Sequence, residues 1–348
     1  MKNTAWSPDS NHFAVLWNWS NGFLDVVEVG QKSRSRLAEN VGDFCWVGNS
    51  NLVYTTISPD RSTRELWRNR LSVNRALLST HEIQELFTHS AGDSEILHAL
   101  SPDGEMTVFA TDKAIAAVNF STTNNLYELP FTNGFKFDVV WDKTSQRCLV
   151  SQLSEAEPAG GLPKTTLLLF DRQGGKWLNV EDLMKDIDKD AEFQLPLPLN
   201  ENELNRQDGV WDSSGQNFLA WSEHWAKISG NPTENSEYYK DWICRAQPWT
   251  AVSVQGQLGT KFGVPVFAPQ GNILAVLKGD FTTAPDSCDI YVSRLSQDPN
   301  GHLILNKPEL VVKAKDSRRT QWFWSADGKE IITFTGSSFK RHSVMMGQ

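Results

Sequence analysis

The sequence has little of what marks an enzyme, a membrane protein or a disulfide-rich domain. Its 348 residues contain only four cysteines, and none is close enough to another to form a C-x-x-C zinc pair. The sequence has no apolar run of the roughly 18 to 20 residues that a membrane helix needs. It also has no H-E-x-x-H, G-x-S-x-G, G-x-G-x-x-G or phosphate-loop motif. We therefore expect small buried thiols, no catalytic residues, no metal site and no cofactor.

Positive charge is also scarce. There are 33 Lys and Arg against 42 Asp and Glu, which gives a formal net charge of −9. Nucleic-acid affinity comes largely from clusters of cations, so we expect no nucleic-acid partner. The negative charge suits a basic protein partner or a cation, or serves solubility alone. The start of the chain has no apolar leader segment, which favours a cytoplasmic location.

Tryptophan, in contrast, is abundant. The 14 Trp residues against 5 Tyr and 5 Met suggest a structural position that recurs along the chain. Seven related five-residue segments, each followed by a short apolar run, carry this pattern. They are 6–10 (WSPDS), 46–50 (WVGNS), 100–104 (LSPDG), 141–145 (WDKTS), 211–215 (WDSSG), 267–271 (FAPQG) and 324–328 (WSADG).

The segment has the chemistry of a turn between two strands. Proline presets φ near −65°, Ser or Asp bonds back to the turn backbone, and Gly accepts a positive φ at the end. The spacing of about 40 to 70 residues suits four-stranded blades with loops, whereas a solenoid would keep a stricter period. We predict an all-β fold, a seven-bladed β-propeller of four-stranded antiparallel blades in one domain, 1–348. The blades are expected to start near residues 2, 42, 95, 135, 207, 261 and 319.

These segments resemble the TolB-type, WD-repeat-like family of propeller repeats, whose signature is W-S-P-D-G followed by an apolar strand. The second copy departs from it by lacking Pro and Asp, and the sixth has Phe267 and Gln270 in place of Trp and Asp. The Gly-His…Trp-Asp signature of true WD repeats is absent. In such a fold we expect the five anchor tryptophans to be buried at the ends of innermost strands. They are Trp6, Trp46, Trp141, Trp211 and Trp324.

Other segments break the repeat. We expect insertions near 181–208 and 223–249, with a short helix at 180–187. A possible capping box, Ser79 to Glu82, suggests a helical turn between residues 71 and 86. The last blade offers strands at 321–324, 330–335 and 341–346 and no fourth. We expect the missing strand to come from further sequence or from a partner, by strand addition at the edge of that blade. The alternative is a three-stranded last blade shielded by a loop.

Acids follow the second strand of four blades at similar distances from their anchors. They are Asp112, Glu155, Glu223 and Asp280. Equivalent positions in a ring of repeats face the same way, so the four carboxylates are expected to line one rim. The first blade places Trp17 and Trp19 there, and the fifth adds His224 and Trp225. The alternative is that polar residues end strands everywhere.

An aromatic and acidic rim suits a basic or amphipathic segment of a partner. We therefore expect a non-catalytic scaffold or sensor domain that contacts a protein partner or the remainder of a larger chain. Two alternatives remain open from the sequence. One is a propeller that gates or forms part of a hydrolase or lyase active site, and the other is a sensor with a ligand in the central channel.

Overall fold

The structure is a computed structural model, which divides into two compact units. Unit 1 contains residues 1–148, 152–163 and 170–177, and unit 2 contains 149–151, 164–169 and 178–348. The residues that the structure describes are 3–17, 22–59, 69–91, 98–110, 114–120, 125–130, 134–154, 165–188, 191–196, 209–223, 239–279, 288–313, 321–334 and 338–344.

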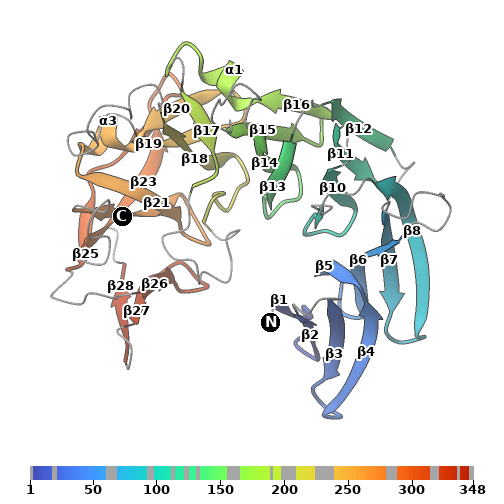
Figure 1. The fold of residues 1–348 in the computed structure, drawn as a ribbon. Coiled ribbons are helices and arrows are strands. Elements are labelled where there is room, and N and C mark those ends of the chain that lie inside the picture. Colours follow the sequence, from blue (N-terminus) through green and yellow to red (C-terminus); the bar gives the residue numbers. More distant parts are fainter. Residues whose placement is uncertain are drawn as a thin grey trace. The chain divides into compact units, whose positions relative to one another are not determined.

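Unit 1 is built from antiparallel sheets in which each strand pairs with the next one along the chain (Figure 1). The first sheet contains β1 (Asn3–Trp6), β2 (His12–Trp17), β3 (Phe23–Glu28) and β4 (Ser33–Glu39). The second contains β5 (Val41–Trp46), β6 (Asn51–Pro59), β7 (Asn69–Leu77) and β8 (Glu82–Ala91). The third contains β9 (His98–Leu100), β10 (Met106–Ala110), β11 (Ala114–Asn119) and β12 (Asn125–Pro130). The fourth, which contributes residues to both units, contains β13 (Gly134–Trp141), β14 (Arg147–Ser154), β15 (Thr165–Asp171) and β16 (Lys176–Asn179).

Unit 2 continues the same pattern after a short helix, α1 (Val180–Met184). The fifth sheet contains β17 (Glu192–Gln194), β18 (Asn217–Glu223), β19 (Tyr239–Arg245) and β20 (Thr250–Ser253), which is followed by helix α3 (Val254–Leu258). The sixth contains β21 (Phe262–Phe267), β22 (Ile273–Lys278), β23 (Asp289–Gln297), β24 (Leu303–Leu305) and β25 (Glu309–Val312). The seventh contains β26 (Gln321–Trp324), β27 (Glu330–Phe334) and β28 (Phe339–Ser343). No helix in the described part of the chain is long and apolar enough to cross a membrane.

The predicted all-β fold of antiparallel sheets is confirmed, and the motif copies mark the sheets. Six of the seven copies begin at the last residue of a first strand: β1, β5, β9, β13, β21 and β26 end at residues 6, 46, 100, 141, 267 and 324. The fifth copy begins at Trp211, which forms an isolated bridge with Phe218 on β18. Short-range turn chemistry therefore marks the end of the first strand in six of the seven sheets, whereas the first strand of the fifth sheet, β17, ends without a motif.

The turns hold together as the motif predicts. In three copies a serine hydroxyl donates to the aspartate two residues later, 2.6 Å away, in the pairs Ser7–Asp9, Ser101–Asp103 and Ser325–Asp327. In the fifth copy Asp212 does this work: its Oδ1 accepts the backbone N–H groups of Gln216 and Asn217 at 3.0 and 3.1 Å. Six copies have a positive φ at their last residue, at Ser10, Gly104, Ser145, Gly215, Gly271 and Gly328.

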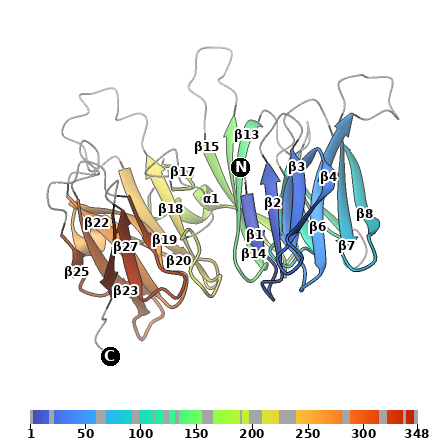
Figure 2. The same cartoon turned by 90° about the horizontal axis from the view of Figure 1, so that it is seen from below.

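The anchor tryptophans join one sheet to the sheet before it. The indole N–H of Trp46 donates to the carbonyl of Ala5 at 3.1 Å, and that of Trp141 donates to Ala99 at 3.2 Å. In unit 2, Trp324 donates to the carbonyl of Val266 at 3.2 Å. Each acceptor lies just before the anchor of the preceding sheet, so the same contact recurs between consecutive sheets. Figure 2 shows the first two sheets of unit 1 side by side.

Burial of the anchors only partly follows the prediction. Trp141 and Trp211 are buried, and Trp46 and Trp324 are half-buried. The prediction is wrong for Trp6, whose side chain is 55% exposed. Trp6 packs on Phe13 of its own sheet, with ring centroids 4.8 Å apart.

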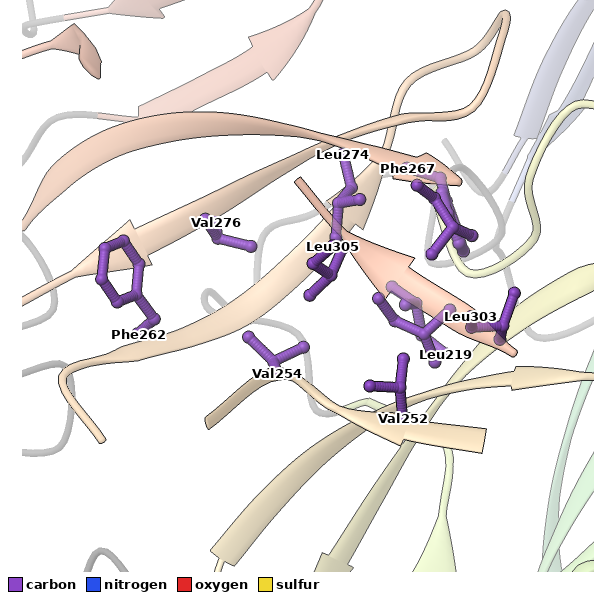
Figure 3. Close-up of a cluster of buried hydrophobic side chains, with 11 residues drawn as sticks. Leu219, Val252, Val254, Phe262, Phe267, Leu274, Val276, Leu303 and Leu305 are labelled. Atoms are coloured by element: carbon purple, nitrogen blue, oxygen red, sulfur yellow. The ribbon is translucent and has the colours of Figure 1, made fainter. Parts of the chain in front are cut away.

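One hydrophobic core cluster of unit 2 lies between its fifth and sixth sheets, and another joins the sixth and seventh. Figure 3 shows apolar side chains from β18, β20, α3, β21, β22 and β24 directed toward one another. Those labelled are Leu219, Val252, Val254, Phe262, Phe267, Leu274, Val276, Leu303 and Leu305. At about 25 cal/mol per Å² of apolar surface, burying one such side chain contributes roughly 1.5 to 3 kcal/mol.

Several local predictions need correction. The segment with Ser79 and Glu82 is a hairpin turn between β7 and β8, where His81 takes a φ of 60°. Residues 69–77 of β7 pair antiparallel with β8, so this segment is a strand and not a helical turn. The expected helix near 180–187 is present and shorter, at α1. The last strand of the seventh sheet starts two residues earlier than predicted, at Phe339.

The two irregular segments supply strands to the fifth sheet. Residues 192–194 form β17, which pairs with β18 through Phe193 and Ser222. Residues 239–245, within the second segment, form β19. Glu181 of α1 fixes this region, because its Oε1 accepts the backbone N–H groups of Leu167 and Phe193 at 3.1 and 3.3 Å.

Candidate functional site at the ends of the second strands

The strands that precede the proposed rim residues are where the sequence predicts them. β2 ends at Trp17, β14 ends one residue before Glu155, and β18 ends at Glu223. The structure describes the side chain of Trp17 and the backbone of Glu223. Six predicted rim residues lie outside the described residues: Trp19, Asp112, Glu155, His224, Trp225 and Asp280. Their convergence stays a prediction.

Trp17 is held in one orientation by a buried carboxylate. Its indole N–H donates to Oδ2 of Asp25 on the neighbouring strand β3, at 2.6 Å. The same oxygen accepts from Arg34 of β4, also at 2.6 Å, and Arg36 approaches Oδ1 at 3.5 Å. Asp25 is only 2% exposed. Burying a carboxylate is costly unless it is paired. The three donors provide this pairing for Asp25.

The two arginines that bind Asp25 also cover the aromatic rings. The guanidinium carbon of Arg34 lies 5.5 Å from the ring centroid of Trp17, and that of Arg36 lies 4.0 Å from Phe23. Both arginine side chains remain about half exposed, at 58% and 47%. Cation–π contacts of this kind contribute about 0.5 to 1 kcal/mol at exposed sites. Asp25 pairs with both arginines, and Glu39 Oε1 lies 3.4 Å from Nη1 of Arg36, so the charges beside Trp17 are balanced. The surface there is therefore aromatic with paired charges, and sequence reasoning missed Asp25, Arg34 and Arg36.

In unit 2 the end of β18 is fixed from both sides. Glu223 is opposite Glu192 on β17 and Tyr239 on β19. One residue earlier, the fully buried Ser222 hydroxyl accepts from the indole N–H of Trp242 at 2.9 Å and donates to Asp188 at 3.3 Å.

Lys240 completes this cluster. Its Nζ lies 3.3 Å from Oδ1 of Asp188 and 5.7 Å from the ring centroid of Trp242. The positive charge of Lys240 is offset by Asp188, and the Ser222 hydroxyl is fully buried. The arrangement therefore positions the strand end and offers no exposed nucleophile. No sequence motif linked Asp188, Ser222 and Lys240, which are far apart along the chain.

The described residues contain no group of three His, Cys, Asp or Glu side chains that could hold a metal ion. The four cysteines are free thiols, and three of them are buried. Burial raises the pKa of Cys45 and Cys244 above the ordinary value. Thiolate is the reactive form, so these two thiols are unreactive at neutral pH.

One buried carboxylate of unit 2, that of Asp241, makes the stability of the protein depend on pH. Asp241 accepts from the side-chain amide of Gln255 at 2.7 Å and from the backbone N–H of Val264 at 3.1 Å, which joins β19 to α3 and β21. Burial raises its pKa above the ordinary value of 3.8, although both hydrogen bonds lower it. The folded state thus binds this proton more tightly than the unfolded state does.

We expect Asp241→Asn to remove the part of the pH dependence of stability that comes from the Asp241 carboxyl. A carboxyl whose pKa is raised by folding adds to the free energy of unfolding at low pH. This addition is lost as the pH rises from about 3.8 through the raised value. The stability of the variant relative to the natural protein should therefore increase as the pH rises from about 4 toward 7. Urea unfolding at a series of pH values measures the difference. A difference that is constant or that decreases with pH contradicts the assignment.

Comparison with known proteins connects this architecture to a fold. No family model and no curated protein sequence matches the chain. Among solved structures, the tricorn protease superposes with a TM-score of 0.51 at 11% identity, over 98% of this chain. This chain spans only 34% of the tricorn protease chain.

Two further structures are similar at a lower level. The β-propeller domain of the Trilobed protease from Pyrococcus furiosus has a TM-score of 0.42 at 10% identity, covering 95% of this chain and 93% of that domain. TolB from Acinetobacter baumannii has a TM-score of 0.36 at 12% identity, covering 86% and 65%. Identities this low inform on fold alone. With its consecutive antiparallel sheets and its superposition on the tricorn protease, the chain has the fold of a β-propeller.

Proposed function

We propose that the chain is a non-catalytic β-propeller that binds a protein segment, as a scaffold or sensor domain of a larger protein or complex. The observation that carries the proposal is the fixed Trp17. Its ring stands partly exposed at a strand end, while its indole N–H is committed to the buried Asp25. A pre-oriented aromatic loses little entropy on binding, which is why such residues anchor interfaces.

The proposal assigns partner binding to the ends of the second strands. In unit 1 the residues are Trp17, Trp19, Asp112 and Glu155, and in unit 2 they are Glu223, His224, Trp225 and Asp280. The carboxylates attract a basic or amphipathic segment, and the aromatics receive its apolar side chains. The repeats are of the TolB type in this proposal, which the Ser–Asp turns and the Trp anchors support. The net charge of −9 disfavours nucleic acid as the partner.

The test uses a defined probe, a fluorescein-labelled amphipathic helical peptide made of Leu and Lys. Reversing two acids of unit 1, in the double variant Asp112→Lys/Glu155→Lys, should weaken its binding roughly tenfold. The free energy of unfolding should change by less than about 0.5 kcal/mol, as for surface substitutions elsewhere. Fluorescence anisotropy gives the dissociation constant, and urea unfolding gives the stability.

The matched control is Glu82→Lys/Glu128→Lys, which changes the net charge equally. Both control acids are exposed on the outer strands β8 and β12 of the same unit. We expect the control to bind the peptide nearly as tightly as the natural protein. An equal loss in both variants would mean that only net charge matters, and a peptide that does not bind the natural protein would also overturn the proposal.

A further inference from the structure

Within the residues that the structure describes, the seventh sheet has three strands, fewer than any other sheet. Its order is β26-β27-β28, whereas each of the other six sheets has at least four strands. Within the described residues, no strand pairs with the outer edge of β28. β28 lies near the C-terminal end of the chain, beside β26 and β27 (Figure 1). An open edge of this kind presents unpaired backbone groups that can receive another strand.

The register identifies which backbone groups face outward. Val344 donates to the carbonyl of Lys329 at 2.8 Å, so this pair bonds directly across β27 and β28. Bonded and non-bonded pairs alternate in an antiparallel ladder, which makes His342–Ile331 and Lys340–Thr333 the next bonded pairs. The N–H and C=O groups of Phe339, Arg341 and Ser343 consequently point away from β27.

The side chains of β28 restrict what can pair there. The strand contains Lys340 and Arg341 and no acid, and Phe339 is 67% exposed. Phe339 stacks on Phe334 at a centroid distance of 4.7 Å, and Nε of Arg341 donates to Glu330 at 2.6 Å. A second copy of β28, paired antiparallel about Arg341, would place Arg341 opposite Arg341 and Lys340 opposite His342. Like charges directly opposite each other are destabilising, which disfavours self-pairing.

We propose that the outer edge of β28 receives an extended acidic segment of a partner protein as a fourth strand. Backbone groups of Phe339, Arg341 and Ser343 supply the ladder, and acids opposite Lys340 and Arg341 supply cross-strand attraction. The net charge of −9 repels such a segment at long range, but at physiological salt this field is screened beyond about 8 Å. The inference rests on the proposed role in binding protein segments, and it names a separate place and a different segment chemistry.

The probe is a blocked, labelled peptide of six alternating Val and Glu residues. We expect it to bind. A peptide of alternating Val and Lys should bind at least tenfold more weakly when both peptides are measured on the Asp112→Lys/Glu155→Lys variant, in which binding of basic segments at the second-strand ends is weakened. Ser343→Pro removes an outward N–H without removing a bond to β27, because Ser343 belongs to a non-bonded pair. It should weaken binding at least tenfold, whereas the control Ser343→Ala keeps the N–H and should bind as the natural protein does.

If Ser343→Pro disturbs β28 itself, loss of binding to that variant would not prove strand pairing. A second test therefore changes the peptide and leaves the protein unchanged. Methylating the alternate peptide nitrogens that would donate to β28 removes strand pairing while the protein stays intact, so binding should be lost. Binding of the methylated peptide, preference of the Asp112→Lys/Glu155→Lys variant for the Lys peptide, or dimers of the free chain in sedimentation would each overturn the proposal. The Asp112→Lys/Glu155→Lys variant should still bind the acidic peptide, and Ser343→Pro should still bind the Leu–Lys peptide. A failure of the proposed binding at the ends of the second strands is therefore distinguishable from a failure of the proposed binding at the edge of β28.

Discussion

Replacing Trp141 with alanine should lower the free energy of unfolding by roughly 3 to 5 kcal/mol, the usual cost of truncating a buried aromatic. The side chain is 4% exposed and meets Phe170 edge-on at a centroid distance of 6.5 Å. Its indole N–H binds the carbonyl of Ala99 in the preceding sheet. The substitution therefore leaves a cavity and removes a contact between consecutive sheets.

Trp141→Phe separates these two contributions. Phenylalanine keeps most of the apolar volume and lacks the N–H, while the Ala99 carbonyl still accepts from the hydroxyl of Thr107 at 3.2 Å. We expect a loss of roughly 1 to 2 kcal/mol, as for one hydrogen bond and a small change in packing. Urea unfolding measures both variants, and a loss below about 1 kcal/mol for Trp141→Ala would contradict the anchor role.

Gly104→Ala should cost roughly 2 to 5 kcal/mol, because two effects coincide at this turn. Gly104 has a φ of +67°, and a residue with a Cβ pays roughly 1 to 2 kcal/mol there. The added Cβ would also stand 2.4 Å from Cγ2 of Val47 and 3.1 Å from the sulfur of Cys45. Valine is stiff at χ1, so this clash requires the backbone to shift and adds roughly 1 to 3 kcal/mol.

Gly271→Ala is the matched control for this substitution. Gly271 occupies the same position of the motif with a φ of +77°, and nothing lies within 4 Å of its added Cβ. It should show the backbone cost alone, roughly 1 to 2 kcal/mol. Equal losses for the two variants would mean that the turn of the third sheet does not press against the second sheet as described.

The sheet positions could be predicted because their signals are local. A five-residue turn carries its own hydrogen bonds and its own positive φ, as Ser101, Asp103 and Gly104 illustrate. The apolar run after each turn then sets the next strand. Seven weak copies at similar spacing make a strong pattern, and the first strand ends at the predicted anchor in six of them.

The rest depends on contacts between distant residues. β17 carries no motif. It is recognised as a strand only from its pairing with β18, in which Glu192 and Phe193 lie opposite residues about 30 positions later in the sequence. Asp25, Arg34 and Arg36 read as ordinary polar residues on β3 and β4 until strand pairing brings them to Trp17. Burial of Trp6 failed as a prediction because the sequence shows the repeated position and not how far each copy is exposed.

Hydrogen–deuterium exchange with the Leu–Lys peptide tests the central claim most directly, namely that partners bind at the ends of the second strands. We expect slower exchange where β2 ends at Trp17 and where β10 and β14 end, in the segments containing Asp112 and Glu155. Exchange in the turns at the opposite ends of these strands, such as that of Ser7 and Asp9, should be unchanged. Slower exchange confined to those turns, or none at all under saturating peptide, would contradict the account.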